Sequence, residues 1–469
     1  MNITTSVLLL MTSTNPIFPN AFIERMQNQL KNDWGKFSDA HLLPSPTSIR
    51  INPKKKSLDN YTDRVQWTDF GFYLSERPAF TFDPLFHAGT YYVQEASSMF
   101  LEQALKQSVD LTQPLRVLDL CAAPGGKSTH LLSLIGEESL LVSNEVIRSR
   151  ATILAENIRK WGNINAVVTN NDPEDFENLN GFYDVIVVDA PCSGEGLFRK
   201  DKSATTEWSE ENANLCSLRQ QRILNQIWPS LKQNGILIYC TCTYNKEENL
   251  GNILRLNSKH KAESLKLNFD IEWNIEEVHQ EGFYGYQLYP YKVKGEGFFI
   301  SVIRKIETES EINIRTKKLF DSPSKKIIER FSSWLKNSDK IEFLQQDDLV
   351  IALSKENVEE IEFLSKRLKV IQKGTAVAAV KHEKLVPEHS FALSNEIKSE
   401  NFPSIEVSLE NAISYLRKDP LNLSSEKTGF HLIKYKNTPI GWVNHLGNRT
   451  NNLYPSNWRI RSNQDFVNE

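Results

Sequence analysis

The stretch LRVLDLCAAPGGKSTHLLSLI, residues 115–135, decides the fold of this chain. Its first part is a continuous apolar run, of the kind that forms a strand covered on both faces of a sheet. Pro124, Gly125 and Gly126 then break the run, and the residues that follow have the composition of a helix. A strand that leads through a short glycine loop into a helix is typical of a parallel α/β unit.

Strands and helices alternate in the same way as far as about residue 305. The further apolar runs are LLVSNEV, NAVVTNND, YDVIVVDAPCSG and ILIYCTC, with the helical segments RSRATILAENIRKWG and SLRQQRILNQIWPSLKQNG among them. Two more strands are expected within QLYPYKVKGEGFFISVIRK, with a turn at residues 295–297. The pattern predicts a doubly wound α/β domain over residues 114–305, with helices on both faces of the sheet.

The composition is that of a globular protein with more than one domain. The chain has 469 residues, 40% of them hydrophobic, and a net charge of −4, so a polyanion would have to be bound by local basic patches. Its five cysteines lie between residues 121 and 242, and an odd number in a long chain is not a disulfide framework. No stretch of the sequence is long and apolar enough to cross a membrane. We therefore expect a cytoplasmic protein.

The regions on either side of the α/β domain differ from it in composition. Residues 16–113 mix helical and strand signals and are expected to form an α+β domain. Residues 306–393 begin as a Ser-, Lys- and Glu-rich linker and continue as a small mixed domain, and residues 394–469 resemble a compact β-rich module. Residues 1–15 are expected to be disordered or to contain a misassigned start, with Met11 as the alternative first residue.

Small residues and acids follow the first three strands, where an open parallel sheet binds its ligand. The loop from Cys121 to Lys127 lets backbone N–H groups approach a ligand, but it has neither G-x-G-x-x-G nor P-loop spacing. Glu145 could accept hydrogen bonds from ribose hydroxyls, and Asp172 could accept one from the adenine amine. Either acid alone could equally be a solvated loop residue. The ordered set favours a nucleoside without a pyrophosphate, and S-adenosylmethionine fits.

Two cysteines come within reach of the same edge of the sheet. The fourth strand ends at Asp189 and is followed by Cys192, and the fifth strand brings Cys242. A thiolate is a strong, soft nucleophile that suits C6 of a pyrimidine ring, and a cation such as Lys127 could lower the thiol pKa. The alternative is that Cys240 and Cys242 pack as small apolar residues. No metal is expected, because Cys-x-Cys lacks the usual ligand spacing.

The segments DLCAAPGGKSTHL, NE, NND, DAPCSGEG and YCTCTYNKEEN resemble, in this order and spacing, the Nol/Nop/Sun family of RNA cytosine-5 methyltransferases. Outside the α/β domain, PTSIRINP, PLFHAGTYYVQEASSM and YPYKVKGEGFF are similar to the bacterial ribosomal RNA methyltransferase F (RsmF) type. The closing GW…LGNRTNNLYPSNWRI is similar to its PUA-like RNA-binding domain. The resemblance implies a Rossmann-like class I S-adenosylmethionine-dependent methyltransferase domain, preceded by an N-terminal α+β RNA-binding domain and followed by small mixed and PUA-like β-rich domains.

The resemblance also implies a role for each matching residue. Cys242 corresponds to the nucleophile and Cys192 to the cysteine that assists product release, while Cys240 is interpreted as a bystander. The chemistry of the reaction adds two further roles: Asp189 would contact N3 of the base, and Lys127 would tune the pKa of the nearby thiol. The residues implied to line the S-adenosylmethionine site are Cys121, Ala122, Ala123, Pro124, Gly125, Gly126, Lys127, Glu145, Asp172 and Asp189. Attack of Cys242 on C6 would make C5 able to accept a methyl group, after the base has left its helix.

Contacts with RNA are expected in two places. In the last module, cations occur without an intervening acid and alternate with Trp442, Tyr454 and Trp458, a pattern that suits phosphates and unpaired bases. The cations are Lys427, Lys434, Lys436, Arg449, Arg459 and Arg461. A second basic patch in the N-terminal domain comprises Arg50, Lys54, Lys55 and Lys56. The residues singled out as RNA contacts are Arg50, Lys54, Arg449, Trp458 and Arg459. The alternative is that the aromatic rings form the core of the module.

Three kinds of function are compatible with these features. The favoured one is an RNA cytosine-5 methyltransferase acting on 16S ribosomal RNA or the small ribosomal subunit, with transfer RNA as the alternative target. A DNA cytosine methyltransferase would use a nucleophile in a Pro-Cys context, as at Cys192, in place of Cys242. A non-catalytic RNA-binding ribosome assembly factor would need none of the chemical residues. We expect the protein to be a monomer, with no metal and no membrane partner.

Overall fold

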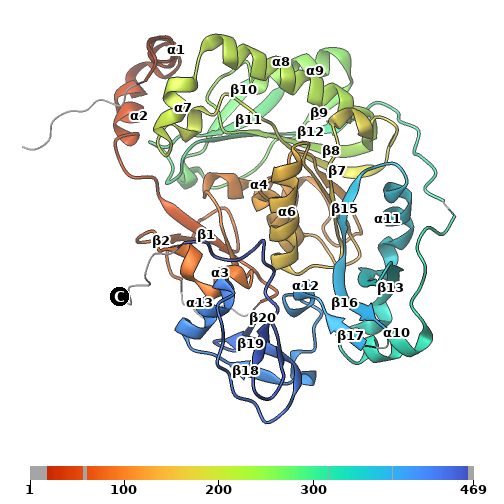
Figure 1. The fold of residues 1–469 in the computed structure, drawn as a ribbon. Coiled ribbons are helices and arrows are strands. Elements are labelled where there is room, and N and C mark those ends of the chain that lie inside the picture. The colour runs from red at the N-terminus through yellow and green to blue at the C-terminus, as the bar shows by residue number, and fades with distance from the viewer. Residues whose placement is uncertain (1–17, 56–60, 316, 383, 463–469) are drawn as a thin grey trace, which may run out of the picture.

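The computed structural model describes residues 18–55, 61–315, 317–382 and 384–462, so the prediction for residues 1–15 lies outside the described part of the chain. A large mixed sheet with helices on both faces forms the centre of the molecule (Figure 1). Three smaller sheets, from the N-terminal, middle and C-terminal parts of the chain, surround it.

The strands predicted from the sequence form the middle of the central sheet. They are β4 (Arg116–Asp119), β5 (Leu140–Asn144), β6 (Ala166–Thr169), β7 (Tyr183–Asp189) and β8 (Leu231–Thr241). β5 and β6 lie on one side of β4, β7 and β8 lie on the other, and all five run parallel. The strand order reverses between β4 and β7, so the carboxyl ends of these two strands border the place where such sheets bind ligands.

Antiparallel strands extend the central sheet at both edges. They are β9 (Ala262–Ser264), β10 (Glu276–Gln280), β11 (Phe283–Leu288), β12 (Phe298–Lys305) and β15 (Val370–Lys373). β11 and β12 are the two strands expected on either side of the turn at residues 295–297, and β12 pairs with both β11 and β8. β15 pairs with β6, so the region 306–393 is not wholly a separate domain: one of its strands completes the central sheet.

Two hydrophobic cores lie on the two faces of this sheet. In β7, Val185 and Val187 point into one core and Ile186 and Val188 into the other. The first face is covered by α4 (Leu101–Ser108), α5 (Gly126–Leu134) and α6 (Arg148–Trp161), and the second by α8 (Glu210–Ile227), α9 (Leu250–Lys259) and α11 (Val358–Ser365). The predicted doubly wound α/β domain is confirmed.

The N-terminal region contains a helical hairpin and a small sheet. Its elements are α1 (Asn20–Leu30), α2 (Trp34–Ala40), β1 (Thr47–Ile51), β2 (Gly71–Leu74), α3 (Pro84–His87) and β3 (Tyr91–Val93). Phe22 and Phe37 of the hairpin are buried against Phe198, Trp208 and Tyr244 of the central domain. The hairpin is thus packed on the segment that follows β8, which carries Cys242.

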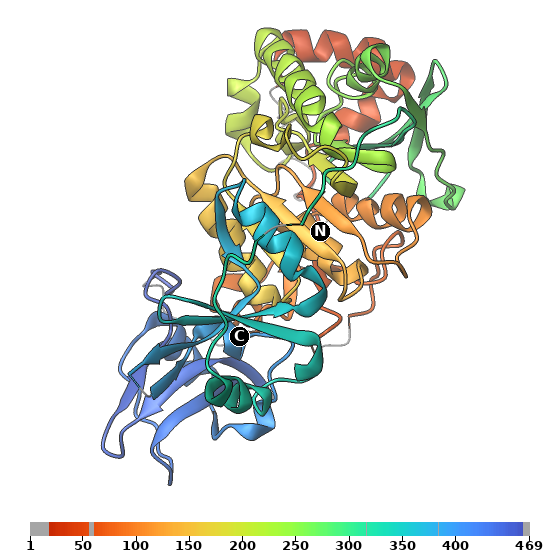
Figure 2. The same ribbon diagram turned by 90° about the vertical axis from the view of Figure 1, so that its right-hand side faces the viewer.

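The middle and C-terminal regions contribute one four-stranded sheet each. The first comprises β13 (Ile341–Gln346), β14 (Leu349–Ser354), β16 (Thr375–Lys381) and β17 (Lys384–Pro387), and the second β18 (Ser404–Glu406), β19 (Gly429–Tyr435), β20 (Thr438–His445) and β21 (Thr450–Asn452). The remaining helices are α7 (Lys202–Glu207), α10 (Lys325–Ser332), α12 (His389–Ala392) and α13 (Leu409–Arg417). Figure 2 shows the two sheets together at one end of the molecule and the α1–α2 hairpin at the other. Within the described residues, every helix is too short or too polar to span a bilayer.

Candidate active site

A cavity of about 690 Å³ opens outside the carboxyl ends of the parallel strands, where the strand order reverses. This size is typical of pockets that enclose a small-molecule ligand. The sequence-predicted residues that line it are Cys121, Ala123, Pro124, Lys127, Glu145, Asp172, Asp189, Cys192 and Cys242. Ala122, Gly125 and Gly126 belong to the same loop but are not among the residues that line the cavity. One cavity therefore brings together the cofactor residues and both cysteines.

The loop between β4 and α5 is fixed by contacts with α6. Gly125 has φ +115°, a backbone conformation that side chains disfavour, and a Cβ there would lie 3.2 Å from a side chain of α6. Arg150 donates a hydrogen bond to the carbonyl of Ala123 at 2.9 Å, and Asn157 donates one to the carbonyl of Pro124 at 2.8 Å. The loop therefore presents one defined edge to the cavity.

Two carboxylates line the cavity at the ends of β5 and β6. Glu145 is only 3% exposed; it accepts a hydrogen bond from the N–H of Ile147 at 2.9 Å and pairs with Arg150 at 3.3 Å. Asp172 caps the short 3-10 turn after β6 and pairs with Arg222 at 3.3 Å. These contacts hold the side chains in place. Since a carboxylate has about four acceptor positions, both can still accept hydrogen bonds from hydroxyl or amine groups of a ligand.

Lys127 and Asp189 form an ion pair inside the cavity. Lys127 Nζ donates to Asp189 Oδ2 at 2.7 Å and lies 5.0 Å from the ring centroid of Phe298. Burial by itself lowers the pKa of Lys127, but the Asp189 carboxylate and other neighbours, among them Asp119, together raise this pKa above its ordinary value. Lys127 therefore stays protonated. The hydrogen bond holds a proton of Lys127 against the Asp189 carboxylate, and the contact of Asp189 with N3 of a base stays a prediction.

The two predicted catalytic cysteines lie side by side. Cys192 Sγ is 3.2 Å from Cys242 Sγ, and both residues are partly exposed in the cavity. The hydrogen bond that Cys192 donates to Cys242 and burial together raise the pKa of Cys192 well above its ordinary value, so Cys192 keeps its proton. Cys240, by contrast, is 0% exposed and packs in a core beneath the sheet, where burial raises its pKa as well. Its position agrees with the interpretation of Cys240 as a bystander.

A buried carboxylate that the sequence analysis did not single out joins the two cysteine loops. Glu248 accepts hydrogen bonds from the N–H and hydroxyl of Ser193 at 2.9 and 2.5 Å, and from the side-chain amide of Gln220 at 2.9 Å. The hydroxyls of Ser193 and Thr243 are 3.0 Å apart, which links the loop after Cys192 to the loop after Cys242. The only signal for Glu248 in the sequence is its place in the segment NKEEN.

The cavity is also lined by exposed cations that the sequence did not single out, namely Lys200, Arg219 and Arg222. The side chains of Lys200 and Arg222 are each 53% exposed, and Arg219 is exposed as well. Lys200 lies 3.6 Å from Glu296 and Arg222 lies 3.3 Å from Asp172, so acids of the same cavity partly neutralise two of these cations.

Arg50 is not an RNA contact, and the prediction for it was wrong. Its guanidinium is 0% exposed, lies 4.6 Å from the ring centroid of Trp161, and donates to Gln94, Thr129 and Ser133 at 2.8, 2.6 and 3.0 Å. Burial lowers its pKa to about 9. The side chain is enclosed because β1 is the central strand of its sheet and faces α5. Arg50 therefore braces α5, the helix that follows the loop between β4 and α5.

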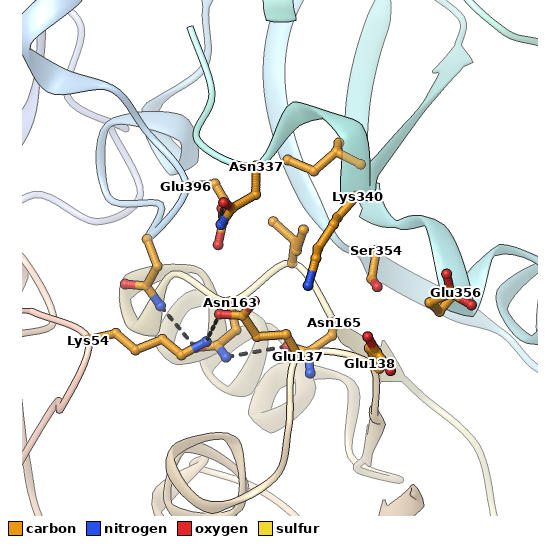
Figure 3. Close-up of a pocket in the computed structure, with 13 residues that line it drawn as sticks. Lys54, Glu137, Glu138, Asn163, Asn165, Asn337, Lys340, Ser354, Glu356 and Glu396 are labelled. Atoms are coloured by element: carbon orange, nitrogen blue, oxygen red, sulfur yellow. Dashed lines mark hydrogen bonds and ion pairs between the residues drawn. The ribbon is translucent and has the colours of Figure 1, made fainter. Parts of the chain in front are cut away.

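Lys54, the neighbouring RNA candidate, lines a second cavity of about 80 Å³ where the N-terminal, central and middle regions meet (Figure 3). Lys54 pairs with Glu137 at 2.9 Å, and Lys340 and Glu396 reach in from the other side. The volume is far below that of a nucleoside pocket. Glu137 already balances the charge of Lys54. Contact of Lys54 with RNA stays a prediction, and Lys56 lies outside the described residues.

The aromatic residues of the C-terminal module form its core, as the alternative interpretation held. Trp442, Tyr454 and Trp458 are 0%, 1% and 8% exposed. Trp458 packs edge-on against His389 with ring centroids 5.2 Å apart, which leaves no open face for a base. Because only 8% of Trp458 is exposed, the prediction that it contacts RNA was wrong. Arg449 and Arg459 are exposed and can reach a phosphate.

Three family models match consecutive parts of the chain. The model described as 16S rRNA methyltransferase RsmB/F matches residues 107–304. The model described as the N-terminal domain of 16S rRNA methyltransferase RsmF matches residues 18–96, and the one described as the methyltransferase RsmF PUA domain matches residues 402–460.

Individual proteins are similar over nearly the whole chain. A ribosomal RNA small subunit methyltransferase F from Shewanella woodyi is 30% identical over 473 residues, which cover 95% of this chain and 96% of that protein. One from Vibrio parahaemolyticus is 30% identical over 475 residues, 94% of this chain and 97% of that protein. Among solved structures, a methyltransferase homolog protein from Pyrococcus horikoshii is 27% identical with a TM-score of 0.52, and the match covers 61% of this chain and 95% of that one.

Proposed function

Because the chain belongs to the ribosomal RNA small subunit methyltransferase F family, we propose that it transfers a methyl group from S-adenosylmethionine to C5 of a cytosine in 16S ribosomal RNA. The observation that carries the C5 chemistry is the pair of sulfur atoms, Cys192 Sγ and Cys242 Sγ, 3.2 Å apart in the cavity that also holds the Lys127–Asp189 ion pair. C5 of cytosine is a poor nucleophile, so a methyltransferase acting on it needs a thiolate that first adds to C6.

The cofactor end of the cavity suits S-adenosylmethionine, which would supply a methyl group on a sulfonium cation. Glu145 and Asp172 offer carboxylate acceptors for ribose hydroxyls and an adenine amine. Val146 and Ile147 line the cavity beside Glu145 and are 52% and 49% exposed, which is unusual for large apolar side chains. A flat adenine ring would cover both of them.

Cys242 acts as the nucleophile in this proposal. Its thiolate adds to C6 of the base, the C5–C6 double bond opens, and C5 becomes electron-rich enough to take the methyl group. Cys192 keeps its proton and can donate an S–H hydrogen bond across the 3.2 Å gap to the Cys242 thiolate. The bond that Cys192 donates stabilises the charged sulfur both before it attacks and when it leaves.

Lys127 and Asp189 act on the opposite edge of the pyrimidine. Addition at C6 places negative charge on N3 and O2, and a hydrogen-bond donor there stabilises the adduct. The proton between Lys127 and Asp189 is available for that role. After methyl transfer a base removes the C5 proton, the electron pair restores the C5–C6 double bond, and the C6–sulfur bond breaks to release Cys242.

The substrate RNA would approach the exposed cations of the cavity. Lys200, Arg219 and Arg222 line the cavity that an unstacked cytosine has to enter. Phosphates on either side of that cytosine would lie within reach of these side chains, and binding should weaken steeply with salt. The proposed substrate implies action in the cytoplasm, and we retain the prediction that the enzyme is a monomer.

Labelled methyl transfer tests this proposal directly. The purified protein should incorporate label from S-adenosylmethionine into 16S ribosomal RNA or the small ribosomal subunit, and bisulfite sequencing should place the product at C5 of cytosine. Transfer RNA transcripts and duplex DNA serve as competing substrates in the same assay. Label found only in transfer RNA would mean that transfer RNA, and not 16S ribosomal RNA, is the target. Absence of label from every substrate would favour the non-catalytic assembly factor.

A further inference from the structure

The segment that carries the nucleophile is held by a helix from outside the catalytic domain. Helix α1 lies against Tyr244, two residues after Cys242, and Gln29 on this helix donates hydrogen bonds to the carbonyl of Tyr244 at 3.1 Å and to the hydroxyl of Tyr289 at 2.9 Å. Arg25, one turn earlier on the same helix, forms an ion pair with Glu195 at 2.6 Å. Two side chains on one face of α1 therefore reach the loop next to Cys242, one directly and one through Glu195.

Glu195 and Gly196 together hold the backbone that immediately follows the nucleophile. Glu195 Oε2 accepts a hydrogen bond from the N–H of Tyr244 at 3.1 Å, while the N–H of Gly196 donates to the carbonyl of Cys242 at 2.7 Å. A Cβ at Gly196 would lie 2.8 Å from that carbonyl oxygen, so the two segments are in close contact. Glu195 and Gly196 follow Cys192 closely in the chain. Their hydrogen bonds to the Cys242 segment therefore also set the position of Cys192 Sγ relative to Cys242 Sγ.

The carboxylate of Glu195 depends on Arg25 for its charge balance. Its side chain is 0% exposed, and its other donors are the indole N–H of Trp208 at 3.0 Å and the Tyr244 N–H. The guanidinium of Arg25 also lies 5.7 Å from the ring centroid of Trp208. Removing the cation would leave a buried carboxylate without a counter-charge, which is strongly unfavourable. Glu195 would then take up a proton or move toward water, and in either case its bond to Tyr244 would change.

We propose that the Arg25–Glu195 ion pair positions Cys242 for attack, so that helix α1 of the N-terminal region is part of the catalytic apparatus. Arg25 and Glu195 are positioning residues, because they act on Cys242 through the backbone of residues 242–244. The inference rests on the proposed role of Cys242 as nucleophile. It assigns to α1 a function that is separate from RNA binding.

The test compares Arg25→Met with a matched variant, Arg116→Met. Arg116 forms a similar part-buried ion pair with Glu360 at 3.1 Å and also lies over an aromatic ring, but it is at the far end of β4, away from the cavity. Arg25→Met should lower kcat by about 10- to 100-fold, because small misplacement of a reacting group has effects of this size. KM for S-adenosylmethionine should stay unchanged, and Arg25→Lys should restore part of kcat. Arg116→Met should leave kcat near that of the wild type.

Hydrogen exchange of the Tyr244 amide gives a readout that does not depend on catalysis. It should be faster in Arg25→Met than in the wild type and unchanged in Arg116→Met, with thermal denaturation recorded for both. An unchanged exchange rate, or a kcat loss in Arg25→Met no larger than in Arg116→Met, would overturn the inference. If the wild type transferred no methyl group, the proposed function would fail, while the exchange measurement would still decide whether Arg25 fixes the Cys242 segment.

Discussion

The carboxyl edge of the central sheet and the C-terminal module were interpreted from the same kind of evidence, with opposite results. At the sheet edge, Lys127, Asp189, Cys192 and Cys242 meet in one cavity, as predicted. In the C-terminal module, Trp458 was predicted to stack on a base and is instead buried. Parallel strands bring their carboxyl ends to one edge whatever residues follow them. An alternation of basic and aromatic residues leaves open which of the two faces the core.

Variants that affect either the chemistry or the folding, but not both, test this difference between the two regions. The largest effect is expected at the sheet edge, for Asp189→Asn. It removes the charge partner of Lys127 and the shared proton, so kcat should fall by about 100- to 10,000-fold. The double variant with Lys127→Met should lose no more than the larger single loss, since residues that act as a unit are not additive. Additive losses in steady-state kinetics would contradict a shared role.

The next largest effect is expected in the C-terminal module, for Trp458→Ala. Removing a buried indole that packs on His389 should lower the free energy of unfolding by about 3–5 kcal/mol. Below the unfolding transition, the KM for a short RNA should be the same as that of the wild type. Chemical denaturation and steady-state kinetics check the two statements separately. A raised KM with unchanged stability would restore the stacking role that the structure excludes.

A smaller effect is expected from pH at the junction where His87 and His389 are buried. Burial lowers the pKa of His87 to about 4 and that of His389 to about 3. Both values lie below the ordinary value of 6.5, so the unfolded chain binds these protons first as the pH falls. The free energy of unfolding that each buried neutral histidine contributes is fully present above pH 6.5. It is lost as the pH falls toward 4, at up to about 1.4 kcal/mol per pH unit for each histidine.

His389→Phe should flatten this pH dependence, whereas substitution of the exposed His279 should leave it unchanged. The measurement is the free energy of unfolding between pH 4 and pH 8. An unaltered slope in His389→Phe would show that this histidine is not buried neutral in solution.

The smallest effect is expected at the exposed cations of the C-terminal module. If Arg449 and Arg459 contact phosphates as predicted, Arg449→Ala and Arg459→Ala should each lower the slope of log affinity against log salt by about 1 and leave kcat unchanged. Glu406→Gln, which neutralises an acidic residue of the same module, is the control. Binding isotherms at several salt concentrations check the slopes, and identical slopes in all three variants would remove these arginines from the RNA interface.

The sequence predicted what depends on the order of strands and missed what depends on contacts between distant segments. Glu145, Asp172 and Asp189 were found because each follows a strand of recognisable type. Glu195 and Arg25 were missed because 170 residues separate them and neither stands in a pattern of its own. β15 was missed as a member of the central sheet for a related reason. A four-residue strand from a later region pairs with β6 only after the chain has crossed the molecule.

Arg50 shows that a charged residue in a basic stretch of sequence is not necessarily exposed. Its neighbours Lys54 and Lys55 made it look like part of a surface patch, yet β1 turns the guanidinium inward among the polar groups of α5. Even Lys55 is largely enclosed: its Nζ donates to the carbonyls of Ala88 and Lys160 at 2.6 Å each, and burial lowers its pKa to about 7. Burial of a cation can be seen only in the folded structure, because it depends on acceptors supplied by other segments.

The most direct test of the account is whether an RNA–protein adduct forms through Cys242. Cys192→Ala, incubated with substrate RNA and S-adenosylmethionine and analysed on a denaturing gel, should accumulate a covalent complex, because release from Cys242 is impaired. The double variant Cys192→Ala/Cys242→Ala should form none, and Cys192→Ala/Cys240→Ser should form as much as the single variant. A complex that forms in Cys242→Ala and disappears in Cys192→Ala would assign the nucleophile to Cys192 and contradict the account.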